Sequence, residues 1–383
     1  MGGHVNGYSI VKELYEQGIK EIALFDSARS LARFSNKVVY HSQIDNNPET
    51  LLKELKLLHS HYDYIVIFPT DDLEVENLHL IYEEVIDFCY LPFNPQNIID
   101  NSNKFFQYQA CENISVPYPK TIHAKNKIDL DSIDGLIFPL LIKPSTRKDS
   151  TTDVFRTLYL EKIEDYVSAK NMLCGYIANG IEFVVSEFIP GDDTNIYAYT
   201  CFRSQGGKIL NEWSGKKLTQ YPDNYGVVCS SSNQAPQEVF NQGRALVEEF
   251  NAFGIIEPEF KYDHRDGKYK LMETNFRSMM WHRTGSISGV KLHETQYNYA
   301  TGRRIHYYDQ DVSATIHFVL MLHEIPNLIA RKGYFKYFKH NIFGGNRRVW
   351  AIFEWGDVKP FLFSLVLLFL MGGGAFLRRF GLR

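Results

Sequence analysis

This sequence lacks the features that indicate export, structural zinc binding or nucleic-acid binding. Its five cysteines are widely spaced and never form a C-x-x-C pair, which predicts a reduced compartment without structural zinc. They are Cys89, Cys111, Cys174, Cys201 and Cys229. A formal charge of −4 and a pI near 6.4 exclude a broadly basic surface, so we expect no nucleic-acid partner. The start of the chain lacks the basic and then apolar pattern of a cleaved export signal, which predicts a cytoplasmic protein.

Internal repeats and signs of disorder are also missing. The apolar share of 44% and the charged share of 22% are close to globular averages. A length of 383 residues predicts two or three packed units, at about 100–200 residues per domain. No Ser-His-Asp or Cys-His arrangement indicates covalent catalysis.

The first part of the chain alternates helices and strands. We expect a helix at 6–17, a strand at 22–25, a helix at 48–60 and a strand at 64–68. The unbroken apolar run of the last strand predicts burial on both faces, and the alternation predicts a parallel sheet. A strand normally precedes a glycine turn such as 2–3, so we expect that the native chain has residues before Met1.

The loop 69–72 follows the second expected strand and reads Pro-Thr-Asp-Asp. Open α/β sheets bind ligands at the carboxyl ends of their strands, so substrate contact is one interpretation of this loop. The other interpretation is an ordinary helix N-cap formed by Thr70 or Asp71.

The rest of the chain predicts a second, mixed region. Its expected helices are 102–113, 163–172 and 236–251, and its expected strands are 138–143, 183–189, 195–202, 208–213, 255–262 and 268–274. The hydroxyl-rich and charged run 145–152 is expected to be a mobile loop. The turn 263–267 has the Asp-Gly chemistry of a tight hairpin.

The expected hairpin carries candidate metal ligands. Glu273 and Asn275 alternate onto one face of their strand, and the hairpin brings Glu259 beside them. Two carboxylates and an amide oxygen suit Mg²⁺ when phosphates and water complete its shell. Arg277, two residues further along, has a planar cation suited to a phosphoryl group in transfer.

Two lysines and one strand end are candidate nucleotide contacts. Lys143 ends a strand and Lys104 lies on a helix, where an ammonium group can neutralise phosphate. The segment 187–191 ends an apolar strand at a Pro-Gly turn, where free backbone groups can meet an adenine edge. For each of these residues alone, a solvated surface side chain is the competing interpretation.

The order of these motifs resembles the ATP-grasp superfamily over roughly residues 90–305. The resemblance rests on 103–104, 142–144, 187–191, 259–261 and 273–277. The segments 2–7, 68–72 and 260–263 are similar to the subgroup that includes D-aspartate ligases and ligases associated with glycan synthesis.

The fold that the resemblance implies is α/β, with an α+β ATP-grasp part. Its expected units are a Rossmann-like pre-ATP-grasp domain (1–92), a small ATP-grasp subdomain (93–180), a large subdomain with the metal site (181–308) and a C-terminal extension (309–383) with a hydrophobic tail.

The resemblance also implies roles for single residues. Lys104 and Lys143 are expected to bind ATP phosphates, and Lys143 and Arg277 to act in catalysis. Glu187, Phe188 and Ile189 are expected to hold adenine and ribose. Glu259, Glu273 and Asn275 are expected to bind Mg²⁺, with Mn²⁺ as a substitute. The loop after Lys143 departs from its relatives, because hydroxyls and Arg147 stand where glycines are common.

The implied reaction joins a carboxylic acid to an amine through an acyl phosphate, with release of ADP. Expected substrates are an amino acid or similar amine and a small-molecule or lipid-linked glycan or peptidoglycan precursor. Asp71, Asp72, Trp281, His282 and Arg283 are expected near the acceptor, although a structural role is equally open for His282. Two alternatives remain: an inactive ATP-binding scaffold, and an enzyme that stops at a phosphorylated product.

The carboxyl end has no charged residue from Pro360 to Leu377. The basic and aromatic segment 332–348 precedes it, and arginines follow it. This pattern favours attachment in the plane of the inner face of the plasma membrane. The competing interpretations are a buried terminal helix and an oligomer contact, such as that of a homodimer.

Overall fold

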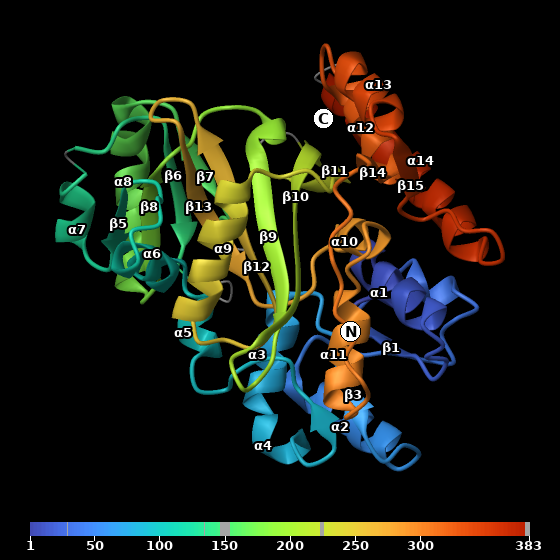
Figure 1. Cartoon of the computed structure of the whole chain (residues 1–383). Helices are drawn as coiled ribbons and strands as arrows, with labels where there is room; N and C mark the ends of the chain where they lie inside the picture. Colours follow the sequence, from blue (N-terminus) through green and yellow to red (C-terminus); the bar gives the residue numbers. More distant parts are fainter. Residues whose placement is uncertain (29, 134, 146–153, 223–225, 380–383) are drawn as a thin grey trace.

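In the computed structural model the chain folds into three packed units and a C-terminal segment that joins two of them (Figure 1). The described residues are 1–379 apart from 29, 134, 146–153 and 223–225, with side chains described to 371. The expected loop 145–152, except Ser145, therefore lies outside the described residues, as does Arg147.

The N-terminal unit contains two parallel strand pairs instead of one continuous sheet. Its elements are α1 (Val5–Glu16), β1 (Ala23–Asp26), η1 (Ala32–Phe34), β2 (Tyr40–Gln43), α2 (Pro48–His59), β3 (Ile65–Val66), α3 (Asp72–Leu80), α4 (Tyr82–Val85) and β4 (Cys89–Tyr90). β1 pairs with β2 and β3 pairs with β4. The prediction of burial on both faces was wrong for β3, because both of its residues are partly exposed.

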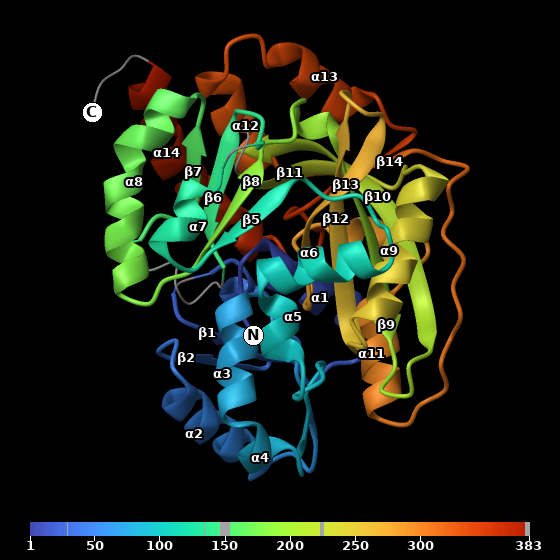
Figure 2. The same ribbon diagram turned by 90° about the vertical axis from the view of Figure 1, so that its left-hand side faces the viewer.

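The second unit is a four-stranded antiparallel sheet with helices (Figure 2). It comprises α5 (Ile98–Ser102), α6 (Lys104–Asn113), β5 (Thr121–Ala124), α7 (Lys127–Asp131), β6 (Leu140–Pro144), β7 (Leu158–Leu160), α8 (Ile163–Ala178) and β8 (Phe183–Glu187). The expected helix 102–113 begins at Lys104, because the Asn103 side chain caps it by accepting from the Phe105 amide at 2.9 Å.

The third unit is built on a seven-stranded sheet ordered β13-β12-β9-β10-β11-β14-β15. Its strands are β9 (Ile196–Arg203), β10 (Ile209–Tyr221), β11 (Val227–Ser232), β12 (Gly254–Asp263), β13 (Lys268–Asn275), β14 (Ile316–Val319) and β15 (Arg347–Trp350). Its other elements are η2 (Asp193–Asn195), α9 (Gln237–Glu249), α10 (Arg283–Ile287), α11 (Leu292–Ala300), α12 (Met321–Ala330), α13 (Phe335–Phe343) and α14 (Lys359–Arg379).

Close packing holds α9 on this sheet. The helix crosses β9 at Gly243, where an added Cβ would lie 2.3 Å from the Cβ of Tyr199. Glycine is therefore required for the approach, since any side chain would push the helix away from the strand. The expected hairpin 255–274 is confirmed as the antiparallel pair β12–β13.

The C-terminal segment is part of the molecule's core and not a separate appendage. β14 and β15 extend the large sheet, and α14 packs against the N-terminal unit, with the rings of Phe34 and Phe363 4.5 Å apart. Among the described residues, no helix is both long and apolar enough to cross a bilayer.

A buried carboxylate anchors this segment to the N-terminal unit. Asp357 is 2% exposed and accepts hydrogen bonds from Tyr8 at 3.0 Å, Ser35 at 2.5 Å and the Asn36 amide at 3.1 Å. The ammonium group of Lys37 lies 3.5 Å from it. Because three donors and a cation converge on one carboxylate, its removal leaves several buried groups unpaired.

We therefore expect Asp357→Ala to lower the free energy of unfolding by about 3 kcal/mol. Chemical denaturation measures the change. Asp309→Ala is the matched control, because Asp309 is exposed, and it should change stability by less than about 0.5 kcal/mol. Equal effects of the two variants would contradict the anchoring role.

Candidate functional site

A cavity of about 660 Å³ lies where residues of the three units meet. Every residue predicted to bind nucleotide, phosphate or metal lines it, from Lys104 on α6 to Arg277 after β13. Residues that are up to 173 positions apart therefore meet at one place, as the sequence predicted. The cavity continues toward the N-terminal unit, where Gly2, Gly3 and the loop 69–72 form its wall.

The predicted metal ligands share one face of the β12–β13 pair. Glu259 lies directly opposite Glu273, and Asn275 lies opposite Glu257. Glu259 is 1% exposed, and its Oε1 has no hydrogen-bond partner among the described residues. Burial and the neighbouring carboxylates of Glu257 and Glu273, against the effect of Lys217, together raise the pKa of Glu259 to about 7.

Lys217 was missed in the sequence analysis. Its ammonium group, only 7% exposed, donates to Glu259 Oε2 at 2.6 Å and lines the cavity. Burial disfavours the charged form, but the carboxylates of Glu259, Glu257 and Glu273 outweigh it, so the pKa of Lys217 is raised. The expected strand ended at 213, whereas β10 runs to Tyr221, so the sequence analysis had not assigned Lys217 to the sheet.

The donor set fits a divalent cation that also binds phosphates. Within the described part of the chain, no three His, Cys, Asp or Glu side chains form a metal cluster. The available donors are the unpartnered Oε1 of Glu259, the Glu273 carboxylate and the Asn275 amide. Mg²⁺ accepts this kind of incomplete oxygen set, because it keeps waters and takes further oxygens from phosphates.

Three ammonium groups surround Glu273. Burial raises the pKa of this carboxyl group, but Lys143, Lys104 and Lys217 together hold it below its usual value. The α6 end that carries Lys104 is tied to the end of β6, since the Lys104 amide donates to the Ser145 carbonyl at 3.1 Å. The two lysines predicted to bind phosphate therefore approach β13 from one side. Because β13 carries Glu273 and Asn275, it is called the metal strand below.

Arg277 links the metal strand to the loop 69–72. Its Nε and Nη2 donate to the two carboxylate oxygens of Asp72 at 2.5 and 3.0 Å. Nη2 also lies 3.4 Å from the amide oxygen of Asn275. Although burial opposes charge, Asp72 raises the pKa of Arg277. The guanidinium group thus lies between the candidate metal ligands and the candidate substrate loop.

The predicted nucleotide strip at 187–189 is partly engaged in the fold. Glu187 Oε1 accepts from the Ile137 amide at 3.1 Å, and the Phe188 amide donates to the Pro139 carbonyl at 2.8 Å. The Phe188 amide is therefore not available to an adenine edge. Ile189 is buried and lines the cavity beside the two residues before it.

The expected acceptor residues divide into two groups. Asp71, Asp72 and Trp281 line the cavity, and Asp71 also caps α3 by accepting from the Leu73 amide at 3.0 Å. His282 and Arg283 are not among the lining residues, because both are buried in polar contacts that turn them away from the cavity.

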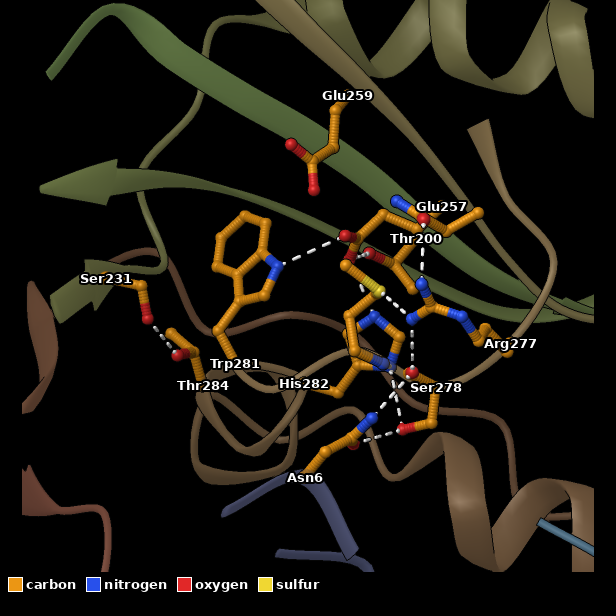
Figure 3. A network of polar contacts seen from close by, with 12 residues as sticks. Asn6, Thr200, Ser231, Glu257, Glu259, Arg277, Ser278, Trp281, His282 and Thr284 are labelled. Carbon is orange, nitrogen blue, oxygen red and sulfur yellow. Dashed lines mark hydrogen bonds and ion pairs between the residues drawn. The ribbon is translucent and has the colours of Figure 1, made fainter. Parts of the chain in front are cut away.

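The contacts of His282 and Arg283 are structural. His282 lies 2.6 Å from the carboxylate of Glu257, which also accepts from the indole of Trp281 at 3.1 Å (Figure 3). Arg283 Nη1 donates to Glu16 on α1 at 2.8 Å. The structural interpretation of His282 therefore holds, and the expected place of Arg283 near the acceptor was wrong.

Comparisons with known proteins agree with this architecture. No family model matches the chain. It is 24% identical over 316 residues to a D-aspartate ligase of Enterococcus faecium (strain Aus0004), covering 76% of this chain and 73% of the relative.

Two solved structures have a similar fold. The N5-carboxyaminoimidazole synthetase of Staphylococcus aureus complexed with ADP has a TM-score of 0.63 and 15% identity, covering 88% of this chain and 84% of that one. The biotin carboxylase domain of the Hydrogenobacter thermophilus 2-oxoglutarate carboxylase, solved as a dimer with MgADP, ADP and bicarbonate, has a TM-score of 0.63 and 15% identity, covering 81% and 70%.

The Lys217–Glu259 pair predicts a competition between the ammonium group and a divalent cation. In Lys217→Met the buried Glu259 carboxylate loses its partner, so stability should fall by about 3 kcal/mol. Added Mg²⁺ should then stabilise the variant at a concentration at least about tenfold lower than the wild type needs, a difference of about 1.4 kcal/mol. Thermal unfolding across a Mg²⁺ titration measures both effects.

The neighbouring lysine gives the control. Lys216 points away from Glu259 and lies 5.5 Å from the centre of the Tyr197 ring. Lys216→Met should leave the Mg²⁺ response unchanged. An unchanged Mg²⁺ response in Lys217→Met would show that its ammonium group does not occupy the cation's place.

The expected fold is confirmed by these similarities, and the relative's membership of the ligases agrees with the enzyme class expected from the motifs. The chain therefore has the α/β fold that the resemblance to the ATP-grasp superfamily implied.

Proposed function

We propose that this protein is an ADP-forming carboxylate–amine ligase that uses ATP and Mg²⁺ and passes through an acyl phosphate. One observation carries the proposal: Glu259 and Glu273 face each other in one cavity, where Lys217 pairs with Glu259 and Lys143, Lys104 and Lys217 all act on the Glu273 carboxylate. Negative charge for a metal and positive charge for phosphates therefore meet at one place, as phosphoryl transfer requires.

Each group at this place has a proposed task. Glu259, Glu273 and Asn275 hold the cation, which when bound offsets negative charge on the phosphates. Lys104 and Lys143 neutralise the phosphates from the opposite side. Arg277 steadies the phosphoryl group that is transferred, because its fork is planar and always charged.

The nucleotide and the substrates occupy opposite parts of the cavity. Glu187, Phe188 and Ile189 line the part proposed for adenine and ribose, where Ile189 supplies apolar contact. The part between α1 and the loop 69–72 is proposed for the substrates. Arg277 and its partner Asp72 stand between the two parts, so an acyl phosphate formed beside Arg277 faces the amine across a short gap.

The substrate class is proposed from the relative's name and from the apolar C-terminal helix α14. The relative is named for D-aspartate, so the proposed acid is an amino acid, with D-aspartate as the first candidate. The proposed acceptor is the amine of a cell-envelope glycan or peptidoglycan precursor, either as a small molecule or linked to lipid.

A surface feature supports a place at the inner face of the plasma membrane. Exposed apolar side chains form one face of α14 at the spacing of a helix: Leu362, Leu365, Val366, Phe369 and Leu370. The opposite side of the helix packs on the protein, through residues such as Phe363 and Leu367. Exposed basic residues lie on α13 and β15 of the same C-terminal segment, including Lys336, Lys339 and Arg348. An apolar face with basic neighbours suits a surface of anionic lipid.

Acid-dependent ADP release tests the activity. With ATP and Mg²⁺, an amino-acid panel that includes D-aspartate should stimulate ADP release in the presence of hydroxylamine, with a hydroxamate as product. Glu273→Gln should lower this rate by at least about 100-fold, because one of the two carboxylates for the cation is lost. Glu248→Gln, at an exposed site on α9, should retain the wild-type rate.

Other results separate the competing functions. ADP binding without any acid-dependent turnover would contradict the ligase proposal and indicate a scaffold. A stable phosphorylated product without a hydroxamate would indicate an enzyme that stops after phosphoryl transfer.

Vesicle sedimentation tests the proposed location. Wild-type protein should sediment with phosphatidylglycerol–phosphatidylcholine vesicles, and Leu365→Glu combined with Phe369→Glu should lower the bound fraction at least about tenfold, because two apolar side chains can no longer be buried in the interface. Leu80→Glu, which changes a leucine of α3 that is 67% exposed, is the matched control.

The same variant tests the alternative occupant of this face. Light scattering that shows a wild-type dimer, which the double variant dissociates, together with no vesicle binding, would assign the face to a homodimer contact. That result would contradict the membrane location.

A further inference from the structure

Ser278 lies where the metal strand, α1 and α11 meet. It directly follows Arg277, is 3% exposed, and does not line the cavity. Figure 3 shows its hydroxyl pointing toward Asn6, with Arg277 on the other side of the same short segment. Ser278 is therefore the point at which the segment that carries Arg277 is held from behind.

The side chain of Asn6 bridges the two chain segments that form the Arg277–Asp72 pair. Its amide nitrogen donates to the Ser278 carbonyl at 2.7 Å and lies 3.5 Å from the Thr70 carbonyl. Its amide oxygen lies 3.0 Å from the Ser278 hydroxyl. The position of Arg277 relative to the loop 69–72 is thus fixed twice, by the ion pair with Asp72 and by the Asn6 amide, which also lines the cavity.

The buried side chains of His293 and Glu13 support Ser278 from the other side. The His293 Nε2 atom lies 2.8 Å from the Ser278 hydroxyl, and its Nδ1 atom lies 2.8 Å from Glu13 Oε2. Glu13 also accepts from the backbone amides of His293 and Glu294 at the start of α11. Burial raises the pKa of Glu13, but the imidazole outweighs this effect and lowers it to about 2.

The donors and acceptors around Ser278 fix the direction of its hydrogen bonds. The Asn6 oxygen can only accept, so the single Ser278 proton is directed to Asn6. His293 Nε2 must then donate to Ser278, and its Nδ1 contacts the Glu13 carboxyl group. Ser278 is thereby linked to α1 twice, through Asn6 and through His293 and Glu13.

A second buried contact fixes the same segment further along. His282 Nδ1 accepts from the Met279 amide at 3.2 Å, so its Nε2 donates to Glu257 at 2.6 Å. Glu257 is the cross-strand partner of Asn275, one of the proposed metal ligands. The segment that follows Asn275 is therefore held at Ser278 by the N-terminal unit and at His282 by Glu257 on β12.

We infer that Ser278, clamped by Asn6 and by the Glu13–His293 pair, is a positioning residue that holds Arg277 between the nucleotide part and the substrate part of the cavity. The inference rests on the proposed ligase function and deepens it. Ser278 does not touch the reacting groups. When the contacts of Ser278 are lost, Arg277 can move with the N-terminal unit or with the large sheet alone. Phosphoryl transfer then slows, while nucleotide still binds.

Two variants break the clamp from opposite sides. Ser278→Ala removes the hydroxyl, and Asn6→Ala removes the bridge between the Thr70 and Ser278 carbonyls. Both should bind MgADP within twofold of wild type by calorimetry, while kcat for amino-acid-dependent ADP release falls at least tenfold. Ser278→Thr, which keeps the hydroxyl, should recover most of the rate.

Ser288→Ala is the matched control, because this buried hydroxyl donates only to the Gly285 carbonyl at 2.9 Å. It should keep both MgADP affinity and kcat. The inference is overturned if Ser278→Ala and Asn6→Ala keep kcat within twofold of wild type, or if both lose MgADP affinity in parallel with kcat, as a general loss of structure would cause.

Hydrogen exchange separates a failure of this inference from a failure of the proposed function. Wild-type protein that shows no amino-acid-dependent turnover rejects the ligase proposal by itself. The clamp is then judged in the MgADP complex, where Ser278→Ala should accelerate amide exchange over residues 276–283 and Ser288→Ala should not. Unchanged exchange in Ser278→Ala would overturn the clamp.

Discussion

Two carboxylates that face each other across neighbouring strands set the main electrostatic constraint on this molecule. Glu259 and Glu273 repel each other in a site with little solvent, where unpaired charge is strongly unfavourable. The fold balances them with ammonium groups from three separate elements: Lys104 on α6, Lys143 on β6 and Lys217 on β10. The four-stranded sheet, which carries Lys143, and the seven-stranded sheet, which carries both glutamates, must therefore meet beside these carboxylates, and the cavity lies between the two sheets.

The N-terminal unit is held to the same junction of the two sheets by charge and by hydrogen bonds. Asp72 binds Arg277 at the cavity, and Asn6, which also lines the cavity, bridges the same two segments. The proposed ligase reaction must bring an activated acid and an amine together without water, so it benefits when the wall proposed for the substrates is fixed to the site proposed for the phosphates. The C-terminal segment adds to this attachment, because Asp357 fastens it to the N-terminal unit while its strands extend the large sheet.

The sequence predicted the parts of the site that depend on local periodicity. Alternation along β13 put Glu273 and Asn275 on one face, and the Asp-Gly turn brought Glu259 opposite, as the pairing confirms. Long-range effects were not predictable in this way. Lys217 was missed because β10 continues eight residues beyond its expected end at 213, and Arg283 was misplaced because its partner Glu16 lies on a helix distant in sequence.

The most direct test of the account is the position of the cation itself. A crystal of the protein grown with ADP and Mn²⁺, measured at the manganese absorption edge, gives an anomalous peak that marks the metal independently of any assay. The account predicts this peak within coordination distance, about 2.0–2.3 Å, of oxygens from both Glu259 and Glu273, with the ADP phosphates on its other side. A peak held by other residues, with Lys217 still bound to Glu259, would contradict it.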